Sequence, residues 1–188
     1  MDVATVNLLF ALLTVAANVA VLGMTGLALA ARRSEAAART RDAAWDRIAE
    51  VALPLAFAVG LTATLGSLYY SQAAHFEPCE LCWYQRIAMY PTPLVLAVAW
   101  WRGDLRIRRY VLPIVTIGAV IAAYHYQLER FPDQAAISCA IDNPCTVVWV
   151  WMFRYISIPF MALSGFALIG WLTWIVGQRA EGSPVDVD

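Results

Sequence analysis

The chain has 188 residues, of which 61% are hydrophobic and only 14% are charged, and its formal net charge is -1. A soluble domain averages about 25% charged residues, so this composition excludes an ordinary water-soluble domain and predicts a membrane protein. A net charge so close to zero gives no reason to expect nucleic acid or a strongly acidic partner.

Five apolar windows are candidates for crossing a membrane. A hydrocarbon core about 30 Å thick needs roughly 20 apolar residues in a helix, and in lipid a helix satisfies its own backbone. The windows are Val6–Ala31, Val51–Tyr70, Trp83–Trp101, Tyr110–Leu128 and Tyr155–Val176. The third is the weakest because Gln85 and Arg86 lie near its start. We therefore expect an all-α integral membrane helical bundle without a long soluble domain.

The first window has a second interpretation, that of a cleaved signal peptide, because Ala28-Leu29-Ala30 is similar to a cleavage site. However, residues 1–4 contain no cation, whereas a signal peptide begins with a positive region. Cleavage would also leave the following Arg-rich loop outside or force a reversal of topology. We favour an uncleaved span. Residues 32–50, rich in Ala and Arg, are expected to continue as a helix with a solvated face.

The arginines between the windows predict the orientation of the bundle. Ten lie on one set of connections, namely Arg32, Arg33, Arg39, Arg41, Arg47, Arg102, Arg106, Arg108, Arg109 and Arg179. Only Arg130 and Arg154 lie on the opposite set. Cytoplasmic loops collect basic residues, so we expect the N-terminus outside and the C-terminus inside. All four cysteines then lie on the outer face, where disulfides persist.

Two outer connections carry the cysteines. The first, residues 71–78, is short, and the second, residues 129–154, contains Cys139 and Cys145. After Cys145 comes an aromatic segment, residues 147–155, which we interpret as lying along the membrane surface before the last span. The alternative is that this segment simply begins that span. A tail that opens at Gly182-Ser183-Pro184 is expected to be disordered.

Cys79 and Cys82 form a Cys-x-x-Cys pair where the third window begins. Such a dithiol closes into a disulfide and reopens, which suits electron transfer. Pro78 fits the first turn of a helix, and the positive end of the helix dipole would favour a thiolate. At 1.5 Å per residue, Cys82 lies roughly 4.5 Å deeper than Cys79. We therefore expect Cys82 to face a lipid-soluble electron acceptor.

Two further ionisable residues are candidates for the acceptor site. Arg86 follows Cys82 by four positions, on the same helix face, and is expected to favour a Cys82 thiolate or to donate to a carbonyl of a bound ring. The alternative is an arginine that extends to the headgroups. His125, near the outer end of the fourth window, would hydrogen-bond a ring oxygen or relay a proton. A simple interhelical hydrogen bond is its alternative, and His75 is assigned no role.

Cys139 and Cys145 close a small loop that contains Asn143-Pro144, a turn former. A disulfide forms easily at this spacing, and its exposed position suits contact with a soluble protein. One alternative to a redox role is that this disulfide only stabilises its loop. Another is that the four cysteines form two unrelated structural disulfides. A zinc site of four thiolates would require the C-x2-C spacing twice. Five residues separate Cys139 from Cys145, so we expect no metal.

The segment Glu77-Pro78-Cys79-Glu80-Leu81-Cys82-Trp83-Tyr84-Gln85-Arg86, with Tyr90-Pro91 after it, closely resembles the disulfide bond formation protein B (DsbB) family. Residues 156–163 and 124–126 are similar to other parts of that family, so the resemblance covers roughly residues 50–178. The short second loop resembles the BdbC-type branch. The departures are this loop and the first span, which the four-helix family lacks.

The resemblance implies a role for each cysteine. Cys79 and Cys82 would pass electrons to a quinone, either ubiquinone or menaquinone, with Cys82 adjacent to the ring and Arg86 contacting it. Cys139 would form the mixed disulfide with an extracytoplasmic thioredoxin-fold (DsbA-like) partner, and Cys145 would be its mate. It also implies a location in the bacterial plasma membrane, in contact with lipid.

The expected domain organisation has three parts: an N-terminal transmembrane helix with its Arg-rich loop over residues 1–50, a DsbB-like four-helix redox domain over 51–178, and a cytoplasmic tail over 179–188. The expected function is reoxidation of a secreted dithiol oxidase with reduction of a quinone. One alternative carries reducing power outward, but no cysteine lies on the inner side or inside a span. The other is a non-enzymatic bundle whose disulfides only staple its loops.

Overall fold

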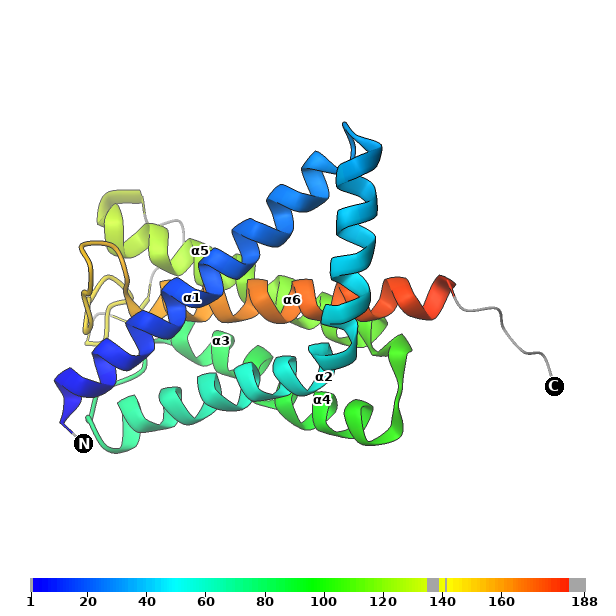
Figure 1. Cartoon of the computed structure of the whole chain (residues 1–188). Coiled ribbons are helices and arrows are strands. Elements are labelled where there is room, and N and C mark those ends of the chain that lie inside the picture. The colour runs from blue at the N-terminus through cyan, green and yellow to red at the C-terminus, as the bar shows by residue number, and fades with distance from the viewer. Residues whose placement is uncertain (1, 135–138, 141, 183–188) are drawn as a thin grey trace.

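A computed structural model describes residues 2–134, 139–140 and 142–182, and within them the chain forms helices and no strand. In chain order the helices are α1 (Val3–Ala30), α2 (Glu35–Gln72), α3 (Glu80–Met89), α4 (Pro91–Arg102), the 3-10 turn η1 (Leu105–Ile107), α5 (Arg108–Arg130), the 3-10 turn η2 (Pro132–Gln134) and α6 (Ile158–Gly182) (Figure 1). The prediction of an all-α bundle is confirmed.

Four helical segments are long and apolar enough to cross a membrane: α1, α2, η1 with α5, and α6. The predicted third span is divided between α3 and α4, which follow one another at Tyr90. Pro91 has no backbone N–H to donate, yet Tyr90 keeps helical angles (φ -64°, ψ -40°) and donates to the Arg86 carbonyl. The two short helices therefore continue one another as one interrupted segment of a multi-pass membrane protein.

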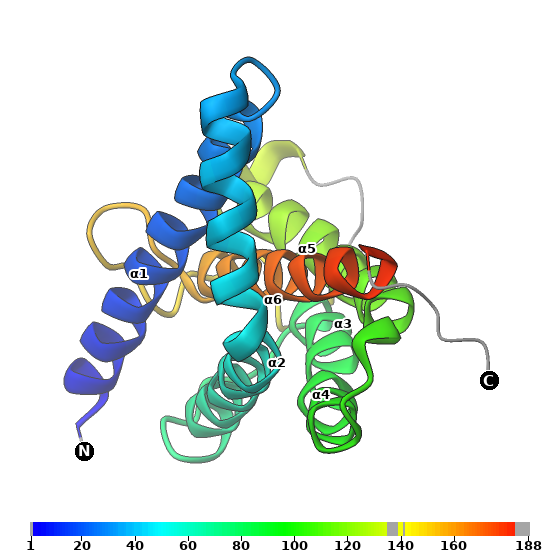
Figure 2. The same cartoon turned by 45° about the vertical axis from the view of Figure 1, so that its right-hand side comes forward.

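α2 contains both the second predicted span and the Arg-rich connection before it, as the sequence predicted. Pro54 lies inside this helix, where its ring removes a hydrogen bond and bends the axis. Figure 1 and Figure 2 show α1 and α2 joined at one hairpin, beyond which the two helices separate and α2 changes direction. The second half of α2 then returns to the N-terminal part of α1, where the Tyr70 hydroxyl donates to Asn7.

α6 lies in the middle of the bundle, with α1, α2 and α5 around it (Figure 1). Its apolar window is 56% buried, against 17% for α1, so α6 supplies the core and α1 lies at the edge. The Phe166 ring of α6 packs directly on Gly118 of α5, where an added Cβ would collide with it. A glycine here lets the two helices approach closely.

The aromatic segment before α6 is not helical. Met152 and Ile156 exchange two backbone hydrogen bonds of 2.8 Å, and positive φ angles at Phe153 and Arg154 reverse the chain between them. The alternative interpretation, in which this segment begins the last helix, is therefore wrong. At the other end α6 continues to Gly182, and residues 183–188 of the predicted tail lie outside the described residues.

Candidate redox site

The Cys-x-x-Cys pair lies at the N-terminus of α3. Cys79 is the N-cap residue and Cys82 lies in the first turn, so Pro78 precedes the cap and is not in the first turn as predicted. The two sulfurs are 3.0 Å apart and both thiols are free. Cys79 is buried and Cys82 is half-buried. The helix thus brings two thiols together at the end where its dipole favours a thiolate.

His125 of α5 contacts Cys79. Its Nε2 lies 3.6 Å from the Cys79 sulfur and 3.1 Å from the Cys145 carbonyl oxygen. Its Nδ1 lies 2.9 Å from the amide nitrogen of Gln85, which is a donor. Nδ1 therefore accepts and Nε2 carries the proton, pointed at the sulfur and the carbonyl. Hydrogen bonding from the Cys82 thiol and then from His125 holds the pKa of Cys79 well below its ordinary value.

The second loop lies against the same pair. Cys139 and Cys145 are joined by a disulfide, as the sequence predicted. Cys145 is buried and belongs to one apolar cluster with Cys79, Leu81 and Leu128. The Asn143 side chain donates to the Pro78 carbonyl at 3.2 Å and ties the two loops together. The disulfide and the dithiol therefore belong to one apolar cluster, with Cys82 and Cys139 packed against it.

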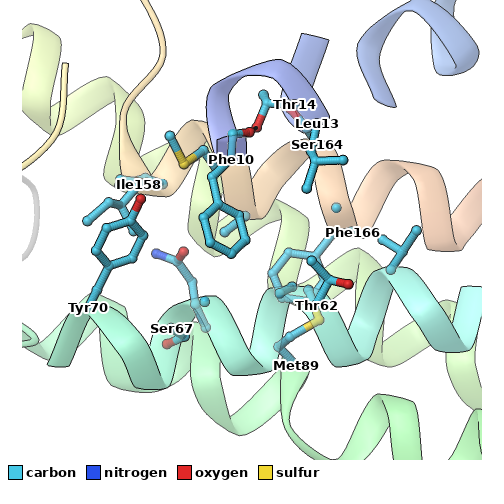
Figure 3. A pocket seen from close by; sticks show the side chains of 18 of the residues that line it. Phe10, Leu13, Thr14, Thr62, Ser67, Tyr70, Met89, Ile158, Ser164 and Phe166 are labelled. Atoms are coloured by element: carbon cyan, nitrogen blue, oxygen red, sulfur yellow. Dashed lines mark hydrogen bonds between the residues drawn. The ribbon is translucent and has the colours of Figure 1, made fainter. Parts of the chain in front are cut away.

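A cavity of about 440 Å³ opens on the other side of the dithiol, bounded by α1, α2, α3 and α6 (Figure 3). Cys82 lines it, whereas Cys79 and His125 do not. Its charged lining residues, Glu77 and Arg86, lie with Gln85 near Cys82, and most of the remaining lining is apolar apart from a few hydroxyl side chains. The dithiol therefore separates two environments: Cys79 faces the second loop and Cys82 faces the cavity.

Arg86 points to α2 and lies against the cavity. Its Nε donates to the Ser67 hydroxyl at 3.0 Å, and its Nη2 donates to the Ser67 carbonyl at 3.1 Å. These bonds use two of the five N–H donors of a guanidinium. The group also lies 5.0 Å from the centre of the Trp83 ring. Arg86 and Cys82 both line the cavity, and a contact of Arg86 with a bound ring stays a prediction.

Sequence reasoning assigned no role to Ser67 or Gln85. Gln85 carried a signal, since a buried amide in an apolar helix needs a partner, but only the packing of α3 on α5 identifies that partner as His125. Ser67 carried none, because a small hydroxyl residue is ordinary in a spanning helix. The expectation that His125 shares the site of Arg86 also differs from the structure, where His125 lies on the opposite side of the dithiol.

Aromatic rings cover the outer end of the cavity. Trp149 of the second loop stacks on Phe76 with ring centres 4.9 Å apart, and Phe76 stacks on Tyr70 at 5.7 Å. Phe10 of α1 contacts Tyr70 at 5.9 Å. This row of rings joins three distant parts of the chain and separates the cavity from the loop surface.

The ligand atoms of Cys79, Cys82 and His125 all lie within 4.8 Å of one another. Two thiolates and an imidazole are a donor set that Zn²⁺ accepts. The sequence-based expectation of a metal-free site therefore stays a prediction.

Comparisons with known proteins agree with this geometry. Residues 49–177 match the family described as "Disulfide bond formation protein DsbB". Disulfide bond formation protein C of Bacillus subtilis is 47% identical over 133 residues, which cover 70% of this chain and 96% of that protein. A probable disulfide formation protein of Deinococcus radiodurans is 41% identical, over 65% of this chain and 86% of that protein. No solved structure shows a significant match.

Proposed function

This chain belongs to the DsbB family, and on that premise we propose that it reoxidises an extracytoplasmic thioredoxin-fold dithiol oxidase and passes the electrons to a membrane quinone. Membership makes it a multi-pass oxidoreductase of disulfide bond formation, in the branch of its BdbC-type relatives. The observation that carries the proposal is the division of the dithiol, with Cys79 packed beside Cys145 and Cys82 lining an apolar cavity.

The proposed orientation places the N-terminus and all four cysteines on the outer side. The division of the arginines, ten against two, supports it. The two cysteine loops also lie at the end of the bundle where the chain begins, and the last turns of α6 lie at the other end (Figure 1). Both disulfide-forming loops would therefore meet the same oxidising compartment.

The first steps are thiol–disulfide exchanges that conserve the number of disulfides. A thiolate of the partner attacks Cys139, the Cys139–Cys145 bond breaks, and Cys145 leaves as a thiolate. Cys145 then attacks Cys79 of an oxidised Cys79–Cys82 pair, and Cys82 leaves as a thiolate on the cavity side. The proximity of Cys145 to Cys79 supports this order. The Nε2–H of His125 is placed to stabilise Cys79 as a thiolate.

The exchange with the partner ends when the second thiol of the partner attacks the mixed disulfide and releases Cys139, which re-forms its bond with Cys145 and frees Cys79. The Cys79–Cys82 pair is left reduced until the quinone takes its two electrons. The partner has then lost two electrons and two protons, and the electrons reside on Cys79 and Cys82.

The cavity suits a quinone as the acceptor. A quinone accepts two electrons and two protons, and it needs an apolar space with hydrogen-bond donors at its carbonyl oxygens. Arg86 and Gln85 supply donors at the end lined by Cys82. Arg86 is held by its two bonds to Ser67, so its remaining N–H groups have a defined position. Ubiquinone and menaquinone share this chemistry.

The two alternatives have less support. A conduit that carries reducing power outward needs thiols near the inner face, whereas the four cysteines gather at one end. A bundle with purely structural disulfides has no use for two adjacent free thiols, one of them activated by a buried histidine.

The test is quinone reduction by the purified chain, supplied with a reduced thioredoxin-fold protein, with the quinone absorbance followed over time. We expect Cys82→Ser to abolish quinone reduction and still to form a mixed disulfide with the partner through Cys139. Unchanged quinone turnover by this variant would refute the assigned role of Cys82.

A further inference from the structure

α1 lies outside the part of the chain that matches the DsbB family, yet it forms one side of the cavity. Resting on the proposed function, we infer that α1 supplies a wall of the channel that holds the isoprenoid tail of the quinone. The helix would then contribute to the choice of acceptor and would not serve only as an anchor.

Hydrogen bonds between helices fix α1 in position. The Asn18 side chain of α1 donates to the Ser164 hydroxyl of α6 at 3.1 Å. Near the outer end, the Tyr70 hydroxyl of α2 donates to Asn7 at 3.0 Å. Such bonds between spanning helices resist separation because lipid offers no replacement partner. α1 is therefore attached to both helices that flank the cavity.

Close packing against α2 adds a third attachment. The Phe10 ring of α1 lies on Gly66, and a Cβ at Gly66 would collide with this ring. In Figure 3 the Phe10 side chain extends from α1 toward α2, between Tyr70 and Phe166. The ring therefore forms part of the cavity wall.

The α1 residues that line the cavity repeat with the period of a helix. Phe10, Thr14 and Ala17 lie at positions i, i+4 and i+7, which is one face of the helix, and all three line the cavity. The Thr14 hydroxyl donates to the Phe10 carbonyl at 2.7 Å, so it needs no partner inside the cavity. This face therefore presents an apolar surface with small side chains at its deeper end.

The cavity is long enough for a ring and part of a tail. Its lining on α2 extends from Tyr70 to Leu55, and at 1.5 Å per residue this is about 22 Å along the helix. The donors Gln85 and Arg86 lie at the outer end with Cys82, whereas Leu55 and Ala17 lie in the deeper part. A quinone with its ring at Cys82 would place its tail between α1 and α2.

The test compares two alanines of α1 in the full-length protein. Ala17→Phe adds a ring on the cavity face, and Ala20→Phe adds the same ring at an exposed position that does not line the cavity. Two readouts are taken: the polyprenyl quinone that copurifies per mole of protein, and the KM for a polyprenyl quinone against that for a tail-less ring analogue.

We expect Ala17→Phe to lower the copurified quinone and to raise the KM for the polyprenyl quinone by about tenfold, because a ring displaces buried methylene groups of the tail. The KM for the tail-less analogue should change by less than about twofold, and Ala20→Phe should match the natural chain. If the natural chain is active and the two variants show the same copurified quinone and the same KM for the polyprenyl quinone, the inferred role of α1 is wrong, while the proposed function stands.

The other outcomes are also decisive. If the natural chain neither retains nor reduces any quinone, the proposed function fails and the inference fails with it. If Ala17→Phe loses both acceptors, Ala17→Leu, which adds less volume, is measured in the same way. A loss confined to the polyprenyl quinone in that variant supports the tail channel, and an equal loss for both acceptors overturns it.

Discussion

The Nε2 atom of His125 lies 3.6 Å from the sulfur of Cys79, and Gln85 fixes the ring from its other side. Both His125 and Gln85 are almost fully buried, so this imidazole keeps its orientation. The contact links α5 to the N-cap of α3, and through the Cys145 carbonyl it also reaches the second loop. One side chain therefore contacts both halves of the proposed relay.

His125→Phe should raise the pKa of Cys79 toward its ordinary value, because it removes an N–H donor that favours the thiolate. Because the pKa of Cys79 is lowered in the natural chain, its thiolate persists as the pH falls; in the variant the Cys79 thiolate should become protonated at a higher pH. The hydrogen bond from the Cys82 thiol is the larger cause of the lowered Cys79 pKa, so the variant should keep part of that lowering. Thiolate absorbance of the reduced protein, followed against pH, measures the change.

The matched control is His75→Phe, which changes the other histidine of the chain, in the first outer loop. His75 does not belong to the cluster with the dithiol, so its replacement should leave the titration unchanged. Identical titrations of the two variants would contradict the role assigned to His125.

Cys145→Ser should trap the partner on Cys139. Cys145 is only 2% exposed, whereas Cys139 is half-buried, so the partner has access to Cys139. In this variant Cys139 is a free thiol, so the disulfide must come from the partner: a single-cysteine thioredoxin-fold protein is supplied as a mixed disulfide with a small aromatic thiol. The Cys139 thiolate attacks the partner sulfur, the aromatic thiol leaves, and neither a second partner thiol nor Cys145 is present to resolve the product. We expect a stable adduct on a non-reducing gel, and no adduct from Cys139→Ser. Comparable yields from the two variants would reverse the assignment.

Arg86→Lys should raise the KM for the quinone about tenfold or more. A lysine keeps the charge but cannot make the forked pair of bonds to Ser67, and a hydrogen bond to a charged group contributes about 1.5–3 kcal/mol. Arg130→Lys is the control, because Arg130 lies over the Trp151 ring and does not line the cavity. Steady-state kinetics of both variants give the comparison, and a KM unaffected by Arg86→Lys would exclude Arg86 from the site.

The orientation predicts which cysteines a membrane-impermeant maleimide reaches in intact cells. A chain that retains only Cys139 should be labelled from outside. A chain that carries only Ser34→Cys, in the hairpin between α1 and α2, should be labelled only after permeabilisation. The reverse pattern would invert the topology and remove the case for an outward-facing disulfide relay.

The positions of the helices along the chain could be predicted from the sequence. Four of the five apolar windows correspond to single helices, and the third is divided between α3 and α4. The rise per residue ranked Cys82 as the deeper sulfur, and Cys82 lines the cavity whereas Cys79 does not; its contact with an electron acceptor stays a prediction. Depth alone does not say which way a side chain points around its helix. The sequence places His125 near one end of its helix, but the rotation of α5 directs it to Cys79, and only the packing of helices settles that direction.

Contacts between distant segments were equally outside the reach of sequence patterns. The hydrogen bond from Asn18 to Ser164 joins residues 146 positions apart, and neither residue has a distinctive neighbourhood in the sequence. The role of α1 therefore emerges only when the bundle is assembled. Tyr90–Pro91 lies inside the single predicted span Trp83–Trp101, where the structure divides α3 from α4 but keeps helical geometry at Tyr90.

Gly118→Ala should destabilise the bundle by about 1–3 kcal/mol, which is the usual cost of overpacking a tight core. A Cβ at Gly118 would collide with the ring of Phe166, which is only 1% exposed. The measurement is the apparent Tm of the purified protein in detergent. In a chain of this size each kcal/mol lowers the Tm by roughly 2–4 °C.

Gly26→Ala is the matched control, because a Cβ at this position of α1 meets no atom within 4 Å. Its effect should be neutral or slightly stabilising, since alanine favours the helix over glycine by up to about 1 kcal/mol. The two substitutions add the same methyl group, so a difference in Tm reports the packing of Phe166 on Gly118. An equal Tm for both variants would mean that α5 and α6 do not pack as closely as the structure places them.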